Sequence, residues 1–289
     1  TWNTTGTISK VTLQYSRDGF SSDIQTIANL TSNPGSYAGT VPDTASDTVR
    51  VRVSHTDDTG AYDDSNANFK IILFVLSSPN GGEIWTVADP HDITWSWTGT
   101  VPFVKLEYST NGGTTYPNVI TPSISNTGSY PWSVSDAISS TVKVRVMDAT
   151  DTDVYDVSNS NFKIRGKFVM TAPNGGELCL IGQIFNITWN TTGTIPNVKL
   201  TYSIDSGLTW PYTIINSVAN TNSYPWSIPD YPNDTPTTQA RVRVIDVNDS
   251  TVYDDSNADF RIRGYFTLTS PNGGEAWIAL SQHNITWNK

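Results

Sequence analysis

The chain repeats itself at the length of a whole small domain. The string Pro-Asn-Gly-Gly-Glu occurs at 79–83, 173–177 and 271–275, so it returns after 94 and then 98 residues. A unit of this size can bury a core of its own, whereas solenoid units of about 20–45 residues cannot. The 289 residues therefore hold about three copies of one domain. Repetition of this kind favours a structural or binding role over catalysis.

Alternating strands recur in every copy. The string Val142-Lys143-Val144-Arg145-Val146 places valines on one face and cations on the other, and matching strings occupy 49–53 and 240–244. A period of two is typical of a half-buried strand, and no helical period is visible. Turn residues separate about seven short strands in each copy. This pattern predicts an all-β chain of tandem immunoglobulin-like (fibronectin III-like) antiparallel β-sandwiches.

One further strand carries an internal proline, which predicts an edge strand or a bulge. It reads Ser-Tyr-Pro-Trp-Ser at 129–133 and again at 223–227, with a weaker version, Ser-Tyr-Ala-Gly-Thr, at 36–40.

Domain boundaries are expected directly after the last strand of each copy. We expect residues 1–73 to form an Ig-like domain that lacks its first strands, 74–166 and 167–264 to form complete domains, and 265–289 to supply the first strands of a further domain or of a neighbouring subunit's domain. These segments are called the first to fourth repeats below. Their linkers are short and apolar, without Gly/Ser-rich or Pro-rich stretches, which predicts fixed junctions and a stiff rod.

The first and fourth repeats together make up one complete copy. Either the chain is an arbitrary segment of a longer array, or the fourth repeat of one subunit completes the first repeat of the next. Strand addition of the second kind is a known mode of association, and a head-to-tail contact that does not close builds a filament. The sequence leaves both readings open. In either case the first repeat alone should expose core residues and an unpaired sheet edge.

The amino-acid composition limits the classes of partner that this chain is expected to bind. The formal net charge is −10 and only 15% of the residues are charged. Such a balance disfavours nucleic acid, whose phosphates require Lys and Arg. The abundance of Thr, Ser, Asn and Asp is typical of an extracellular β-protein, and no apolar run in this segment is long enough to insert into a membrane. The single cysteine, Cys179, falls where other copies have Trp85 and Trp277, so we expect a buried apolar substitute rather than a disulfide.

Acidic loops after the alternating strands are the candidate metal sites. Carboxylate and amide oxygens at short spacing suit Ca²⁺, which takes six to eight oxygen ligands. The alternative is a solvated loop whose Asp and Asn side chains form Asx turns. The candidate ligands are Asp148, Asp151, Asp153, Asp156, Asp246, Asn248, Asp249 and Asp254.

The segment Ser203–Trp210 fits the Asp-box pattern Ser-x-Asp-x-Gly-x-Thr-Trp, with degenerate copies at 109–116 and 16–19. We interpret it as a hairpin whose Ser and Asp side chains satisfy turn amides, and not as a glycosidase signature. Most Trp and Tyr residues recur at fixed repeat positions, as core residues do. Trp97 and Trp210 depart from the shared pattern, so we expect them to be exposed and to be the candidates for a glycan platform.

Catalytic and cofactor-binding residues are not expected. The three histidines, His55, His91 and His283, align with no acid, nucleophile or metal-ligand spacing, and we expect them on the surface.

The series Pro-Asn-Gly-Gly-Glu, Ile-Thr-Trp, Tyr-Pro-Trp-Ser, Val-Arg-Val and Asp-x-Ser-Asn-x-x-Phe covers the whole chain. It resembles the bacterial Ig-like repeat known as Ser-Thr-rich and GPI-anchor-like, which is related to a fungal cell-wall glucan-assembly (Kre-Knh-like) domain. The resemblance implies a large secreted, cell-surface or S-layer protein, or a spacer in a secreted protease or glycosidase. It implies no catalytic residues and no lipid anchor in this segment.

The expected function is therefore non-catalytic: a structural segment of an extracellular bacterial surface protein, such as an S-layer, filament or stalk. Self-association in a lattice or filament, and contact with cell-wall or surface glycans, are the expected partnerships. The alternative is an adhesin, or a carbohydrate-binding or spacer module of a secreted enzyme.

Overall fold

The computed structural model describes residues 1–42, 44–230 and 237–288. Those ranges contain strands and turns only, and no helix in them could span a membrane. The chain divides into two compact units. The first comprises Thr1–Trp85, Pro90–Ser133 and Ser139–Lys163, and the second comprises Thr86–Asp89, Val134–Ile138 and Ile164–Lys289.

The first repeat forms one five-stranded sheet with the order β2-β1-β3-β4, in which β5 also pairs with β3. Its strands are β1 (Val11–Ser16), β2 (Gln25–Leu30), β3 (Ser46–His55), β4 (Tyr62–Asp64) and β5 (Phe69–Ile71). Residues 36–40, the weak copy of the proline-containing strand, are not a strand here.

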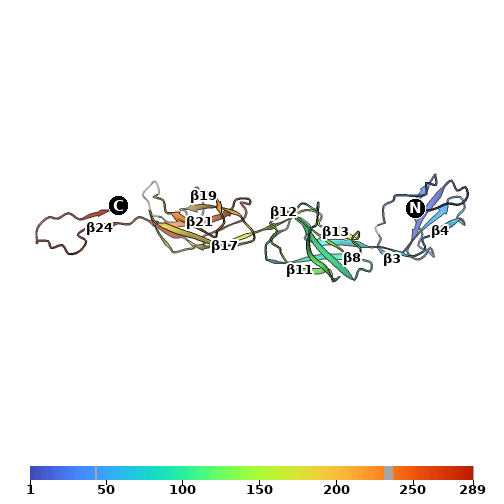
Figure 1. The fold of residues 1–289 in the computed structure, drawn as a ribbon, viewed down its shortest axis with the longest axis horizontal. Helices are drawn as coiled ribbons and strands as arrows, with labels where there is room; N and C mark the ends of the chain where they lie inside the picture. The colour runs from blue at the N-terminus through green and yellow to red at the C-terminus, as the bar shows by residue number, and fades with distance from the viewer. Residues whose placement is uncertain (43, 231–236, 289) are drawn as a thin grey trace. The chain divides into compact units, whose positions relative to one another are not determined.

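The second repeat forms two sheets, β11-β8-β6 and β10-β9-β12-β14-β7, with β13 paired to β12. Its strands are β6 (Leu73–Ser78), β7 (Ile84–Thr86), β8 (Pro90–Thr98), β9 (Phe103–Ser109), β10 (Asn118–Ser125), β11 (Ser129–Ser133), β12 (Ser139–Asp148), β13 (Tyr155–Val157) and β14 (Phe162–Arg165). Figure 1 shows β8, β11, β12 and β13 of this set in green and cyan.

The third repeat has the same plan in the second unit: β15-β17-β20 and β16-β23-β21-β18-β19, with β22 paired to β21. Its strands are β15 (Lys167–Ala172), β16 (Leu178–Leu180), β17 (Ile184–Thr192), β18 (Asn197–Ser203), β19 (Tyr212–Ala219), β20 (Ser223–Ser227), β21 (Thr237–Asp246), β22 (Tyr253–Asp255) and β23 (Phe260–Arg263). In the fourth repeat β24 (Thr267–Ser270) pairs with β25 (Thr286–Asn288).

The buried faces follow the sequence alternation. In β12, Val142, Val144 and Val146 are fully buried while Lys143 and Arg145 between them are only half-buried. Burying one face of each sheet against the other removes the valines from water, which is the main favourable term in forming a sandwich. A three-stranded sheet facing a larger sheet, with antiparallel neighbours apart from the parallel pair β16–β23, is the immunoglobulin-like architecture, so the predicted fold class is confirmed. The proline-containing strand β11 lies at a sheet edge, as its Pro131 predicts.

A tryptophan–asparagine hydrogen bond recurs in all three larger repeats. Trp95 Nε1–H donates to Asn126 Oδ1 at 2.8 Å, and Trp189 Nε1–H donates to Asn220 Oδ1 at 2.9 Å. The Trp2 indole makes the same bond to Asn33 at 2.7 Å. An indole N–H needs such a partner when it is buried, so this bond fixes the central Trp at the same place in each copy.

Candidate functional site

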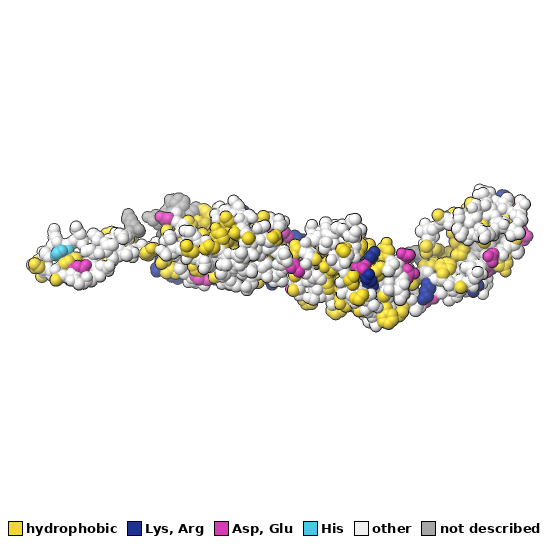
Figure 2. All heavy atoms as spheres, viewed as in Figure 1, with side chains coloured by type: hydrophobic (Ala, Val, Ile, Leu, Met, Phe, Trp, Pro, Cys, Tyr) yellow, Lys and Arg dark blue, Asp and Glu magenta, His cyan; other side chains and the backbone are white. Residues whose placement is uncertain are grey.

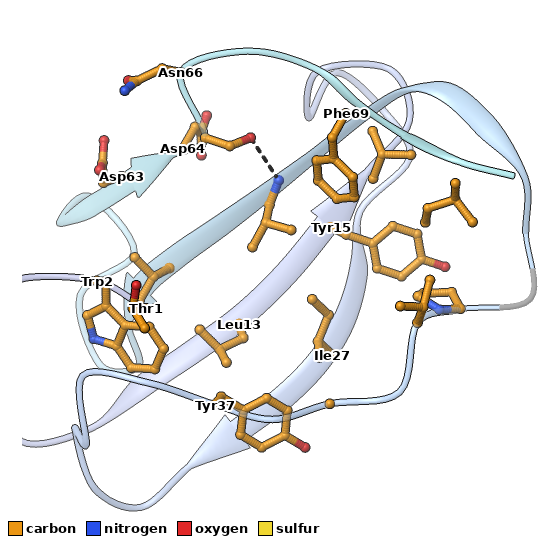
Figure 3. A pocket seen from close by; sticks show the side chains of 18 of the residues that line it. Thr1, Trp2, Leu13, Tyr15, Ile27, Tyr37, Asp63, Asp64, Asn66 and Phe69 are labelled. Atoms are coloured by element: carbon orange, nitrogen blue, oxygen red, sulfur yellow. Dashed lines mark hydrogen bonds between the residues drawn. The ribbon is translucent and has the colours of Figure 1, made fainter. Parts of the chain in front are cut away.

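The first repeat carries an open apolar groove on one face of its sheet. The groove encloses about 630 Å³ and is lined from β1, β3 and β5 and from the segment 37–42. Figure 3 shows Leu13, Tyr15 and Phe69 around this space, with Asp63 and Asn66 at its rim. Figure 2 shows hydrophobic side chains gathered in the hollow of the part that carries the N-terminus. An open apolar hollow of this kind marks a ligand or partner site.

The groove lies where complete repeats have their core. Phe69 is 42% exposed, whereas its counterparts Phe162 and Phe260 are 1% and 0% exposed. Val51 and Val53 are half-buried, while the residues at the same positions in the second and third repeats are fully buried. In those repeats the strands before the central Trp cover this face. Among the described residues, no such strands pair in the first repeat, and the groove lies on this face of its sheet.

Polar groups at the rim of the groove occupy the positions of groups that form hydrogen bonds with the first strand in the second and third repeats. In the second repeat Asp156 Oδ2 accepts a hydrogen bond of 2.7 Å from the Leu76 N–H. In the same repeat Ser158 Oγ donates to the Pro79 carbonyl at 2.7 Å.

The third repeat makes the same two bonds. The Met170 N–H donates to Asp254 Oδ2 at 2.6 Å, and Ser256 Oγ donates to the Pro173 carbonyl at 2.6 Å. The first repeat presents Asp63 and Ser65 at these positions. Among the described residues, the Asp63 carboxylate accepts no hydrogen bond, while the Ser65 hydroxyl turns to the Ala67 carbonyl at 3.3 Å.

Gly39 enlarges the groove. It stands at the position of Trp132 and Trp226, which are buried core residues of the second and third repeats. The rings of Trp132 and Trp85 meet edge to face with their centres 5.9 Å apart. In the third repeat Trp226 and the small Cys179 belong to the same core cluster. In the first repeat Gly39 carries no ring of its own, and the Tyr37 ring lies over it.

The fourth repeat exposes apolar residues whose counterparts in the second and third repeats are buried. Phe266 is 78% exposed, whereas Phe74 and Phe168 at the same position are 5% and 2% exposed. Its other apolar residues at core positions are exposed as well, namely Leu268, Trp277 and Ile285.

Local order in the fourth repeat does not depend on a sandwich. The Glu275 carboxylate accepts hydrogen bonds of 2.8 Å from the Asn272 and Gly273 N–H groups, which lowers the pKa of Glu275. The turn is the same one that Glu83 and Glu177 hold. Gly273 has φ of 115°, a backbone conformation open to glycine and strained for other residues.

The Trp277 and His283 rings of the fourth repeat stack at 4.3 Å, as Trp85 and His91 do at 4.5 Å. The histidines were expected simply on the surface, and this stacking was not predicted from the sequence. A signal was present, because the repeat that replaces the Trp by Cys179 also replaces the His by Phe185.

The candidate calcium ligands do not converge on one point. Asp156 and Asp254 turn to the first strands of their own repeats, as described above. Asp148 Oδ1 accepts from the Thr150 N–H at 2.8 Å, and Asp246 Oδ1 accepts from the Asn248 N–H at 2.8 Å.

The remaining loop carboxylates make similar turns, Asp151 with the Asp153 N–H at 3.1 Å and Asp249 with the Thr251 N–H at 3.2 Å. Within the described ranges, no group of three or more His, Cys, Asp or Glu side chains is placed to hold a metal ion. The loops thus show the Asx-turn geometry that was the alternative to calcium. Calcium binding itself stays a prediction.

The Asp-box is a hairpin turn. Ser203 Oγ donates to Asp205 Oδ1 at 2.5 Å and accepts from the Gly207 N–H at 2.9 Å. Asp205 also accepts from the Thr209 N–H at 2.9 Å and from its hydroxyl at 2.5 Å. These bonds lower the pKa of Asp205 to about 2, with the Ser203 hydroxyl as the largest cause. The structural interpretation of this motif is confirmed.

An arginine sits between two aromatic rings in each of the three larger repeats, a feature not predicted from sequence. Arg243 lies 4.1 Å from the Trp210 ring centre and 4.1 Å from that of Tyr253. Arg52 and Arg145 occupy the same position in the other two repeats. The expectation that Trp210 is exposed is therefore wrong, because Arg243 covers one face of its ring and the side chain is half-buried. Trp97 is 36% exposed, as expected.

Cys179 is buried, as expected for an apolar substitute, and burial raises the pKa of its thiol to about 12. A thiol with such a pKa is protonated at neutral pH and unreactive.

No family model matches the chain, and no curated protein sequence matches it. Among solved structures it is similar to the fibronectin(III)-like modules of Clostridium thermocellum CbhA, with 15% identity and a TM-score of 0.24 over 66% of this chain and 95% of that one. It is also similar to the N-terminal four Ig domains of Dscam1 isoform 9.44, with 11% identity and a TM-score of 0.34 over 89% of this chain and 66% of that one. For Sidekick-1 immunoglobulin domains 1–5 the identity is 10% and the TM-score 0.23, over 88% of this chain and 52% of that one.

Proposed function

We propose that this chain is a non-catalytic structural segment of an extracellular surface protein, such as an S-layer, a filament or a stalk. The observation that carries the proposal is the recurrence of the same inward contacts in successive repeats. The Trp–Asn bond, the Glu-held turn and the Asp bond to the first strand appear in both the second and the third repeat. A protein that repeats its core while its loops vary works through length, spacing and valency.

Two further observations support an extracellular setting. The surface is rich in Thr, Ser, Asn and Asp, and the chain carries a net charge of −10, which keeps repeated domains soluble. The motif series resembles the Ser-Thr-rich, GPI-anchor-like repeat of bacterial surface proteins. Stiff junctions between repeats, and thus an extended stalk, form part of the proposal.

Electron microscopy of the native surface tests this function. Antibodies raised against residues 1–289 should label an ordered layer, fibre or stalk on intact source cells, and proteases added to intact cells should remove the label. Labelling confined to the cell interior, or to a structure without repeating order, would contradict the proposal.

The alternative function, glycan binding, has one observation in its favour: Trp97 on β8 exposes part of its ring. Exposed aromatic faces stack on sugar rings. Binding to a glycan array that is lost in Trp97→Ala but kept in Trp210→Ala would support this alternative, because the Trp210 ring is already covered by Arg243. Equal binding by both variants would assign the signal to another surface.

A further inference from the structure

We propose that the fourth repeat of one copy docks into the groove of the first repeat of a second copy and completes its sandwich. The occupant is thus a second copy of this chain, bound head to tail. This inference rests on the proposed structural function and deepens it by naming the partner and both contact surfaces. Strand addition to an incomplete sandwich uses backbone hydrogen bonds for affinity and side-chain pockets for specificity.

Apolar residues match position by position. In the second repeat, Phe74, Leu76 and Trp85 are buried on the sheet that corresponds to the groove. The fourth repeat presents Phe266, Leu268 and Trp277 at these positions, all of them exposed. The groove presents Phe69, exposed where its counterparts are buried, so each partner lacks the contacts that the other provides.

Ring sizes match as well. The second repeat packs Trp85 against Trp132, and the third packs Cys179 near Trp226. The proposed junction places Trp277 beside Gly39 and against the Tyr37 ring that lies over it. The incoming ring with its stacked His283 therefore enters a cavity of about 630 Å³ from which the facing Trp is absent.

The strand registers of the third repeat indicate how the incoming segment would pair with the first repeat. There β16 runs parallel to β23, with Cys179 opposite Ile262, and β17 runs antiparallel to β20, with Ile187 opposite Tyr224. The same registers place Trp277 opposite Ile71 and Ile285 opposite Tyr37. Residues 36–40 have no strand partner in the first repeat, and this pairing would convert them into the edge strand that their sequence indicates.

Polar groups at the rim find partners in the same way. The Asp63 carboxylate is placed to accept the Leu268 N–H, as Asp156 accepts the Leu76 N–H and Asp254 accepts the Met170 N–H. The Ser65 hydroxyl is placed to donate to the Pro271 carbonyl, as Ser158 and Ser256 do to their prolines. A carboxylate that accepts a hydrogen bond from a backbone N–H fixes the register of a contact that is otherwise apolar.

The sequences of the fourth repeat and the first repeat overlap by three residues. Thr286-Trp287-Asn288 repeats Thr1-Trp2-Asn3, and the Trp2 indole already holds Asn33. Residues 265–285 therefore suffice to complete the sandwich. On docking, β24 exchanges its own partner β25 for residues 1–3 of the receiving copy, and residues 286–288 of the incoming copy remain outside the sandwich. Since the donor and acceptor surfaces lie on different parts of each copy, the contact is heterologous and successive copies add to a chain.

Two variants of the 289-residue chain test the docking. Phe69→Asp places a carboxylate in the groove, and Phe266→Asp places one on the incoming segment. Both residues are exposed in the free chain, so both variants should fold. Leu208→Asp, at an exposed apolar residue outside both surfaces, is the matched control.

Sedimentation velocity gives the readout. Wild type and Leu208→Asp should form a concentration-dependent ladder of oligomers, and each docking variant alone should be monomeric. A mixture of the two docking variants should form dimers and nothing larger, because one intact groove then meets one intact segment. A monomeric wild type, a ladder in either variant alone, or a monomeric mixture would overturn the inference.

The two proposals fail in different ways. Oligomers in solution without surface labelling of cells would leave the docking intact and remove the surface function. Surface labelling with a monomeric wild type would keep the function and assign the groove to another segment, such as residues that precede Thr1 in a longer chain.

Discussion

The Asp254 carboxylate accepts a hydrogen bond of 2.6 Å from the backbone N–H of Met170, across 84 residues of sequence. The bond joins strand β22 to β15, the first strand of the same repeat. Its counterpart between Asp156 and Leu76 is 2.7 Å long. These carboxylates therefore work as anchors for the first strand of a sandwich.

Removing such an anchor should destabilise its repeat. In Asp156→Ala the Leu76 N–H loses its acceptor within the sandwich, at a cost of about 1–3 kcal/mol in the free energy of unfolding. The matched variant Asp63→Ala should leave the monomer unchanged, because Asp63 accepts no hydrogen bond among the described residues, but should weaken self-association. Urea unfolding measures the first effect and sedimentation the second. Equal destabilisation by both variants would refute the assignment.

The hydrogen-bonded Asp205 carboxylate of the Asp-box should make the folded chain less stable in acid. The pKa of Asp205 is lowered to about 2 in the folded chain, against about 3.9 for an unfolded Asp. A depressed pKa means that the stabilisation is complete above pH 4 and is lost as the pH falls toward 2. Asp205→Asn should keep the hairpin, because Asn111 holds the same turn in the second repeat through Ser109 and Thr115.

The measurement is the urea midpoint as a function of pH. Between pH 5 and pH 2.5 it should fall less steeply in Asp205→Asn than in wild type. Identical slopes would show that the Asp205 carboxylate does not contribute to the acid sensitivity.

Arg243 should stabilise the third repeat through its rings and its ion pair. It lies between Trp210 and Tyr253 and donates to both oxygens of Asp255, at 2.5 and 2.7 Å. Arg243→Ala should cost about 0.5–2 kcal/mol. The stability of Arg243→Lys should lie between those of the wild type and Arg243→Ala, since Lys keeps the charge without the planar guanidinium fork. Arg263→Ala, at an exposed arginine, is the control, and a loss as large as that of Arg243→Ala would contradict the role given to the rings.

The Asx-turn alternative to the calcium site predicts that calcium leaves the chain unchanged. The loop carboxylates of Asp148, Asp151, Asp246 and Asp249 already accept hydrogen bonds from their own turns. Calorimetric titration with Ca²⁺ should therefore give no binding heat, and a chelator should not shift the melting temperature. Heat with a defined stoichiometry would support the acidic loops as the calcium site that the sequence predicts.

Local patterns in the sequence predicted the strands, because alternation such as that from Val142 to Val146 is decided by burial of one face. The sequence also predicts that residues 1–73 lack the first strands of the other copies, and this stays a prediction. The roles of Asp156 and Asp254 were not predictable, because their partners lie 80 and 84 residues away. An acidic loop has the same composition whether it binds a cation or a backbone N–H.

Trp210 was misjudged for a similar reason. Its departure from the shared pattern suggested exposure, but Phe20 and Tyr116 are different aromatic residues that cover an arginine at the same place. The repeat conserves an aromatic face toward the arginine and not the identity of the ring.

Amide hydrogen exchange on the wild-type chain, followed as its concentration rises, tests the docking most directly. Residues 69–71 and residues 267–278 should gain protection together as oligomers form, while β12 and β21 stay protected throughout. Oligomers that form while residues 69–71 and 267–278 remain unprotected, or equal protection of these residues in the monomer, would contradict completion of one copy's sandwich by another.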